Sequence, residues 1–204
     1  LTPAMQAKRL NSVNPLDPGD SRDIERRIDL AARRFAASGK PFVFRISPLG
    51  EGPVSRHLDG RGWSRFSESI VMSAPLADMP LDREISQIPL KDVARFASAA
   101  MQVHELDATG GAGLAETVSA IEPETGLFVI EQEQAPVATA VCVHDGELAG
   151  MFEVAAAASV RGQGHGRRIM MSALKWARMR GASRAWLQVE ADNAPAIGLY
   201  RSLG

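Results

Sequence analysis

The chain has 204 residues, of which 45% are hydrophobic and 23% are charged, and its net charge is -1 at neutral pH. This length allows one large domain or two small ones with hydrophobic cores. The balanced charge argues against nucleic acid or an anionic membrane as the main partner, because both select a basic excess. The single cysteine, Cys142, predicts a reducing cytoplasm. No apolar run approaches the roughly 20 residues of a membrane span, no signal-peptide pattern occurs, and no motif predicts a metal site.

The first half of the chain alternates between strand-like and helical segments. Strands are expected at 7–15, 41–47 and 65–74, and helices at 24–37 and 54–58. The first helix shows helical spacing of its apolar residues and is closed by Gly39, a residue typical of helix C-termini. Residues 75–90 contain Pro75, Pro80 and Pro89 and are predicted to be a linker.

The second half begins again at Leu90 with a different order of elements. Helices are expected at 91–106, 112–121, 167–180 and 193–203, and strands at 127–133, 136–147, 148–155 and 185–191. Asp145 and Gly146, flanked by alternating apolar residues, predict a tight hairpin between the second and third strands.

The two halves contain a repeat. Gly39 and Gly62 are 23 residues apart, and so are Gly181 and Gly204. In each span a helix end is followed by glycine, a strand, a short helix and a second glycine. We therefore predict a duplicated strand–loop–helix–strand–helix unit, with a first half at 1–78 and a second half at 79–204.

The stretch VRGQGHGRR, at 160–168, places alternating glycines among arginines at the start of a predicted helix. Glycines let backbone N–H groups converge on an anion, and a helix start adds unpaired N–H groups and the positive end of its dipole. The first half has GDSRDIER (19–26) at the same offset, with Arg22 and Ile24 opposite the second and third glycines. Its acidic residues suit a helix N-terminus but would repel a phosphate. Only the second half is therefore expected to bind a phosphate group.

Three nucleotide-binding motifs compete for this stretch. A Walker loop requires Gly-Lys-Ser/Thr, which does not occur here. A dinucleotide fingerprint has the pattern G-x-G-x-x-G and an acidic residue about 20 positions later. Gly162, Gly164 and Gly166 have the wrong last interval, but Glu190 mimics the acidic residue, so a nucleotide-dependent oxidoreductase stays an alternative. The third motif, R-x-x-G-x-G, is met by Arg161, Gly164 and Gly166.

This third motif and its surroundings resemble the GNAT superfamily of acyl-CoA-dependent N-acyltransferases. From about Leu127 to Gly204, the strand LAGMFEVA, the loop, the strand AWLQVEA and the tail ADNAPAIGLYRSLG follow the family's order. The resemblance implies an α/β fold with a mixed, mostly antiparallel sheet flanked by helices. It also implies a first half that is a degenerate copy of the same fold, as in tandem members. The family continues with two more strands, and this chain starts at Leu1 rather than Met, so segments are expected to be missing at both ends.

The resemblance further implies acetyl-CoA as the acyl donor, lying between two strands that splay apart. Backbone groups of Val154, Ala155 and Ala156 would contact its pantetheine arm. Asn193 would lie near the arm, and its alternative role is the N-cap of the last helix. The pyrophosphate would be held by the loop residues Arg161, Gly162, Gln163, Gly164, His165, Gly166 and Arg167.

The implied reaction is direct attack of an amine on the thioester, with Tyr200 as the general acid that protonates the departing thiolate. The first half has Leu58 at the position that corresponds to Tyr200. An amine that is protonated at neutral pH needs a general base. Gln188 stands where some relatives carry a glutamate, so Glu153 on the preceding strand is the predicted base and Glu190 is the alternative.

The expected acceptor is a small-molecule amine or a peptide or protein amine, bound by the helices at 91–121 together with the first half. A homodimer is also among the expected assemblies. A non-catalytic module that binds or senses acyl-CoA is the second reading of the function, because the loop motif does not itself supply a base.

Overall fold

The computed structural model describes residues 10–17, 22–83 and 87–204. The chain divides into two compact units, and the division lies between Phe66 and Ser67, ahead of β1 rather than after residue 78. Strand β1 (Ser69–Pro75) belongs to the second unit because it pairs along its whole length with β5 (Arg184–Glu190).

The segment expected to be a linker, 75–90, instead contributes to the second unit's core. It contains two short 3-10 helices, Leu76–Asp78 and Leu81–Arg83. Leu76 and Leu81 are fully buried there, so these turns are held by apolar packing.

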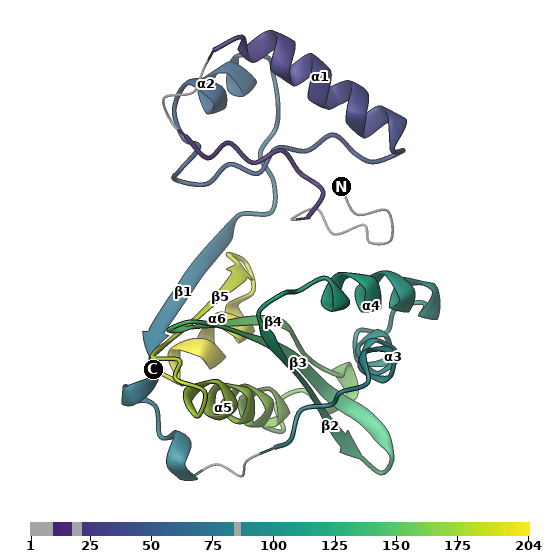
Figure 1. Ribbon diagram of the computed structural model, residues 1–204, viewed down its shortest axis with the longest axis vertical. Coiled ribbons are helices and arrows are strands. Elements are labelled where there is room, and N and C mark those ends of the chain that lie inside the picture. The colour runs from purple at the N-terminus through teal and green to yellow at the C-terminus, as the bar shows by residue number, and fades with distance from the viewer. Residues whose placement is uncertain (1–9, 18–21, 84–86) are drawn as a thin grey trace. The chain divides into compact units, whose positions relative to one another are not determined.

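The described residues of the first unit form two helices, α1 (Ile24–Ala37) and α2 (Pro53–Gly60), at the positions expected from the sequence (Figure 1). Its apolar centre is a group of aromatic rings whose neighbouring centroids are 5.2 or 5.3 Å apart, formed by Phe35, Phe42, Phe44 and Trp63. These separations are typical of attractive edge-to-face contacts.

The strands expected at 7–15 and 41–47 are reduced, in the described part of the first unit, to one parallel bridge between Val13 and Phe44. Residues 7–9 lie outside the described residues. The Val13 N–H group donates to the Val43 carbonyl at 2.8 Å, and the Arg45 N–H group donates to the Val13 carbonyl at 2.8 Å. Pro15 follows the bridge, and because proline lacks an N–H group it cannot extend the ladder.

Two helices of the second unit match those of the first in length. Helix α5 (His165–Arg178) has 14 residues, like α1, and α6 (Ala194–Arg201) has 8, like α2. Helix α5 begins 141 residues after Ile24, and α6 begins 141 residues after Pro53. The interval between the two helices is therefore the same in both units.

This helix register corrects the alignment suggested by the glycine spacing by one residue. The residue before each long helix has a left-handed backbone, with φ 48° at Asp23 and φ 85° at Gly164. Asp23, rather than Arg22, therefore stands opposite Gly164. By the same register Asp59, rather than Leu58, stands opposite Tyr200.

The second unit is built on one five-stranded sheet in the order β1-β5-β4-β3-β2. Its remaining strands are β2 (Glu124–Gln132), β3 (Ala135–Asp145) and β4 (Leu148–Ala156). Only β4 and β5 pair in parallel, and all other neighbours are antiparallel. The mixed, mostly antiparallel sheet expected from the sequence is confirmed.

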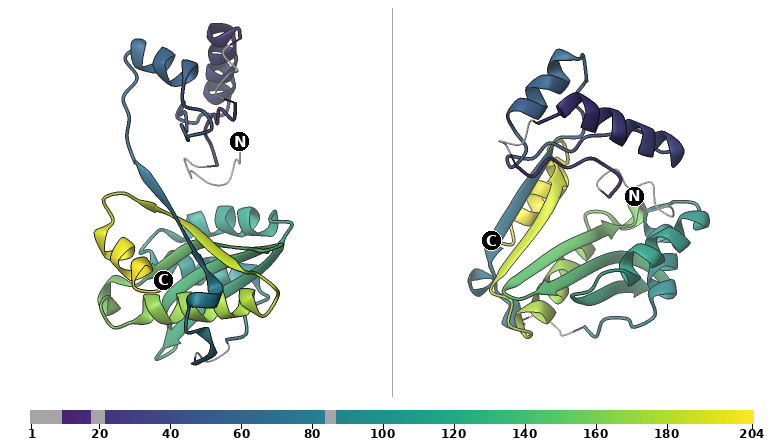
Figure 2. Two further views of the ribbon diagram at one scale, coloured as in Figure 1. Left: turned by 90° about the vertical axis from the view of Figure 1, so that its left-hand side faces the viewer. Right: turned by 45° about the horizontal axis from the view of Figure 1, so that its top comes forward.

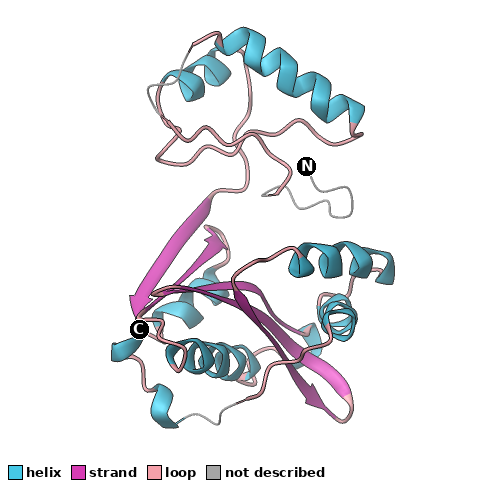
Figure 3. Ribbon diagram, viewed as in Figure 1, coloured by secondary structure: helices cyan, strands magenta, loops and turns pink. Residues whose placement is uncertain are grey.

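Helices cover both faces of this sheet. Helix α5 packs on one face, and α3 (Val93–Val103) and α4 (Gly111–Ser119) lie on the other side (Figure 3). The apolar residues of α5 recur with helical spacing and form one buried face, where each of these side chains is at most 2% exposed: Ile169, Met170, Ala173, Leu174 and Ala177. No helix in the described ranges is both long and apolar enough to cross a membrane.

Candidate active site

Strands β4 and β5 pair over only part of their length. Leu148 to Met151 pair with Arg184 to Leu187, whereas β4 continues to Ala156. Figure 2 shows β5 diverging from β4 beyond this point. The other edge of β4 stays paired with β3. Over the described residues, the β5-facing edge of β4 after Met151 therefore has no strand partner, and its backbone groups are available to an extended ligand.

A β-bulge marks the place where the strands separate. The β3–β4 register shifts between Thr139 and Val141, and opposite this shift Glu153 has φ 48°, an uncommon value for a residue other than glycine. Met151 and Val154 both pack into the core that contains α5. In a regular strand Glu153 would share a face with Met151, so the bulge removes the Glu153 carboxylate from the apolar core.

Two side chains from other elements hold Glu153. The hydroxyl group of Thr139, a fully buried residue on β3, donates to the Glu153 carbonyl at 3.3 Å. His104, which follows α3, places Nε2 at 3.5 Å from the Glu153 Oε2 atom. Both side chains in this contact are 33% exposed, so solvent and a ligand can reach the carboxylate.

The three glycines of the loop have different structural roles. Gly162 and Gly164 have φ 77° and 85°, in the left-handed region that favours glycine, and a Cβ atom at either would meet nothing within 4 Å. Gly166 lies in the first turn of α5, where a Cβ atom would come within 3.2 Å of the Leu199 Cδ2 atom. The first two glycines shape the loop, and the third lets α5 approach α6 closely.

The N-terminus of α5 presents unpaired N–H groups. Gly164 supplies no side-chain cap, and the first intrahelical bond runs from the Arg168 N–H group to the Gly164 carbonyl at 3.0 Å. The first turn of α5 contains no acidic residue. Arg161, in the loop before α5, and Arg168, near the start of α5, are both exposed. The helix start is therefore electropositive and fits an anion.

Arg167 has a structural role in addition to its place beside the glycine loop. Its guanidinium group donates to the Ser202 carbonyl oxygen at 3.2 Å and lies 3.4 Å from the Ser202 hydroxyl group. This contact ties the start of α5 to the end of α6. The charge of Arg167 still adds to the positive potential at the helix start.

Helix α6 carries the two remaining candidates. Asn193 is its N-cap, because the side-chain oxygen accepts a hydrogen bond from the Ala196 N–H group at 3.1 Å. The capping role weighed in the sequence is confirmed. Tyr200 packs partly buried against the core of the second unit. Burial raises the pKa of the Tyr200 hydroxyl group, which therefore stays protonated at neutral pH.

The corresponding helix start in the first unit is acidic. Glu25 lies in the first turn of α1, where it pairs with Arg61 and lies 3.4 Å from the His57 Nε2 atom. The hydrogen bond from Arg61 lowers the pKa of Glu25, so its carboxylate stays ionised. An anion would meet this negative charge at the start of α1.

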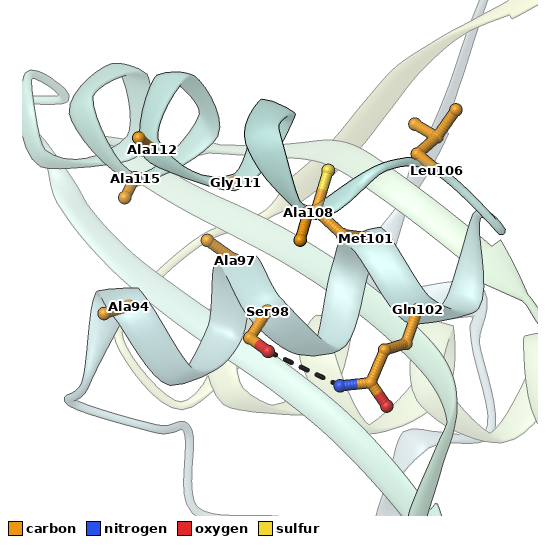
Figure 4. A pocket seen from close by; sticks show the side chains of 10 residues that line it. All are labelled: Ala94, Ala97, Ser98, Met101, Gln102, Leu106, Ala108, Gly111, Ala112 and Ala115. Carbon is orange, nitrogen blue, oxygen red and sulfur yellow. Dashed lines mark hydrogen bonds between the residues drawn. The ribbon is translucent and has the colours of Figure 1, made fainter.

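A shallow groove of about 340 Å³ lies between α3 and α4 (Figure 4). Its lining is mostly apolar, and its two polar side chains, Ser98 and Gln102, bond to each other at 3.4 Å. No titratable side chain lines this groove.

Comparison with known proteins identifies the family. Residues 92–204 match the model of the Acetyltransferase (GNAT) family. The chain belongs to this family. It is similar to a streptothricin acetyltransferase from Streptomyces lavendulae, with 35% identity and with 50% of this chain and 67% of that protein covered.

A solved structure extends the likeness to most of the chain. A GCN5-related N-acetyltransferase from Kribbella flavida has a TM-score of 0.65 and 24% identity, and the match covers 93% of this chain and 74% of that chain. This likeness shows the GNAT fold. The chain is therefore a GNAT acetyltransferase, from a family that uses acyl-CoA donors, and the oxidoreductase alternative is set aside.

The sequence did not point to His104 or Thr139. His104 lies within the helix predicted at 91–106 and Thr139 lies in an alternating strand, and neither has a spacing relation to Glu153 in the sequence. The β-bulge places both residues in contact with Glu153, and no local sequence pattern predicts that bulge.

Replacing Thr139 with valine is expected to lower turnover while leaving acetyl-CoA affinity nearly unchanged. The Glu153 carbonyl loses its donor at the bulge, which costs about 1 kcal/mol of stability and loosens the backbone that carries the carboxylate. Thr117→Val is the matched control, because its hydroxyl group donates to the Gly113 carbonyl at 2.8 Å within α4. Thermal melting and steady-state kinetics of both variants test this. Equal turnover in the two would show that the bulge does not need Thr139.

Proposed function

We propose that this GNAT acetyltransferase transfers an acetyl group from acetyl-CoA to a primary amine of a small molecule. The observation that carries the proposal is the open edge of β4 after Met151, followed directly by the glycine loop and the uncapped start of α5. An extended arm fits the strand edge, and a pyrophosphate fits the helix start. The two features lie in the same order as the parts of a CoA molecule.

In this proposal, backbone groups of Val154, Ala155 and Ala156 pair with the pantetheine arm. Ala155 and Ala156 pair with β3, and Val154 lies at the bulge beside them. This pairing fixes the direction of the backbone groups on the other edge of β4. Asn193 uses its oxygen for the helix cap, which leaves its NH₂ group to donate to the arm. The N–H groups of the loop and of the first turn hold the pyrophosphate, from Arg161, Gly162, Gln163, Gly164, His165, Gly166 and Arg167.

Glu153 acts as the general base and Tyr200 as the general acid. The Glu153 carboxylate is held out of the core by the bulge and is partly exposed, so it can take a proton from the acceptor ammonium group. The amine nitrogen then bonds to the thioester carbonyl carbon, and the C–S bond breaks. Tyr200 is protonated at neutral pH and can give its proton to the leaving sulfur. The second proton on the acylated nitrogen then returns to the Tyr200 oxygen through solvent, which leaves a neutral amide.

The acceptor class rests on the similarity to a streptothricin acetyltransferase. That protein's name gives streptothricin as its substrate, and we propose an amine-bearing small molecule of this kind as the acceptor here. Thiol release measured with streptothricin-like amines, polyamines and peptides would identify the class. Faster release with peptides than with small amines would overturn this choice.

Calorimetric titration with acetyl-CoA is expected to show one site per chain. The first unit lacks glycines at the positions that correspond to the glycine loop, and Glu25 gives the start of α1 a negative charge. Titration with NAD is the control and is expected to show no binding. Two sites per chain would contradict the assignment of the anion site to the second unit alone, and no binding of acetyl-CoA would overturn the proposed function. Binding without thiol release against the whole amine panel would favour an acyl-CoA sensor.

A further inference from the structure

His104 contacts the Glu153 carboxylate at the point where β4 and β5 separate. The Nε2 atom of His104 lies 3.5 Å from the Glu153 Oε2 atom. The two residues come from different layers, because His104 follows α3 and Glu153 lies in the sheet. The pair is therefore a tertiary contact that forms only when α3 docks on the sheet.

The backbone that carries His104 is held firmly at the end of α3. The His104 N–H group donates to the Ala100 carbonyl at 2.9 Å, and the Leu106 N–H group donates to the Met101 carbonyl at 2.9 Å. Glu105 has φ 55°, so this helix ends in a Schellman-type turn without glycine. Val103 beside it is 3% exposed. The imidazole thus projects from a fixed position.

Glu153 needs such a partner because its own backbone conformation is unfavourable. A non-glycine residue with φ 48° persists only where its surroundings determine it, and such strained positions are common at functional sites. The Thr139 hydroxyl group holds the Glu153 carbonyl, but it leaves the carboxylate free to rotate. The carboxylate itself is contacted by the His104 side chain.

We infer that His104 is a positioning residue for the general base, and that it orients the Glu153 carboxylate toward the amine acceptor. This inference rests on the proposed function, in which Glu153 takes the acceptor's proton. The Nε2 atom of His104 lies beside Oε2, which leaves Oε1 to receive the proton. The acceptor ammonium group loses one proton to Glu153, and its nitrogen forms a bond to the acyl carbon as the C–S bond breaks. The sulfur leaves with the proton of Tyr200, and the second proton on the nitrogen returns to the Tyr200 oxygen through solvent.

A double-mutant cycle tests whether His104 acts through Glu153. Glu153→Gln is expected to lower kcat about 100-fold because it removes the base. His104→Ala is expected to lower kcat roughly tenfold to 100-fold, since a misplaced reacting group is costly, while the Kd for acetyl-CoA measured by calorimetry stays unchanged. In the Glu153→Gln background, His104→Ala is expected to have no further effect on kcat.

A conservative variant separates positioning from folding. His104→Gln keeps an N–H donor and is expected to recover most of the activity lost in His104→Ala. His144→Gln is the matched control, because His144 forms another His–Glu contact, 3.9 Å from Glu124, at the far end of β3. Its kcat is expected to equal that of the unchanged protein. Should His104→Ala fail to fold, His104→Asn replaces it, because it keeps a polar residue at the helix end.

The outcomes distinguish the inference from the proposed function. Equal losses from His104→Ala in both backgrounds, or no recovery in His104→Gln, would overturn the positioning role and leave Glu153 as the base. An unchanged kcat in Glu153→Gln would instead remove Glu153 from the mechanism. A loss of activity in His144→Gln as large as in His104→Ala would indicate a general effect of the imidazoles on the fold, and this result also overturns the inference.

Discussion

Replacing Gly164 with aspartate is expected to weaken acetyl-CoA binding by at least about 100-fold, since like charges brought together cost several kcal/mol. The new carboxylate would stand at the uncapped start of α5, where the pyrophosphate is proposed to bind. The fold should survive, because a Cβ atom at Gly164 meets nothing within 4 Å. Asp23 already adopts a left-handed conformation at the corresponding position before α1. Calorimetry measures the affinity, and thermal melting checks the fold.

Gly164→Asn is the control for this variant. Asparagine has nearly the same shape and tolerates the left-handed region, but it carries no charge. Both variants should lose a similar amount of stability, about 1 kcal/mol for a side chain in this conformation. We expect Gly164→Asn to bind acetyl-CoA more tightly than Gly164→Asp, and the gap between them to shrink at high salt. Normal affinity in Gly164→Asp would mean that the loop does not hold the pyrophosphate.

The structural features that the sequence predicts correctly are local. The glycine loop, the apolar face of α5 and the hairpin at Gly146 each depend on neighbouring residues, because backbone preference and helical periodicity act over a few positions. The hairpin is confirmed by the pairing of Asp145 with Leu148. Asn193 as an N-cap belongs to the same class, since a cap is a contact over three residues.

The parts that the sequence does not predict depend on long-range pairing. Strand β1 pairs with β5 across more than half of the chain, so its place in the second unit is invisible to local patterns. A bulge changes the face of every later residue in a strand, and simple alternation does not reveal it. The contact between His104 and Glu153 depends on both the bulge and the docking of α3.

The comparison of the two units also shows the limit of a glycine-based alignment. Glycines mark turns, and one extra residue in a turn moves the glycine while the helices keep their register. Gly181 follows α5 by one residue more than Gly39 follows α1. The helix bounds therefore give the better alignment, and they place Asp59, an ionised side chain bonded to Arg65, opposite Tyr200. On this alignment the first unit lacks the proposed general acid.

Replacing Tyr200 with phenylalanine is expected to lower kcat about 100- to 1000-fold, because general acid catalysis contributes on that scale. The change removes one oxygen atom from a ring that packs against the core, so the fold and the Kd for acetyl-CoA should be preserved. In the described part of the chain no hydrogen-bond partner holds the Tyr200 hydroxyl group, which leaves it to donate to a leaving sulfur. Single-turnover thiol release and calorimetry on the same samples separate chemistry from binding.

The pH dependence gives a second test of Tyr200. Burial raises its pKa above the ordinary value of 10.0, so the folded protein keeps this proton at a pH where an exposed tyrosine has begun to lose it. Activity that depends on the protonated hydroxyl group should therefore persist up to that pH and fall only above it. In Tyr200→Phe this alkaline fall should disappear, while the acid limb that reflects Glu153 stays. A variant with unchanged kcat and the same alkaline limb would remove Tyr200 from the mechanism and assign the sulfur's proton to solvent.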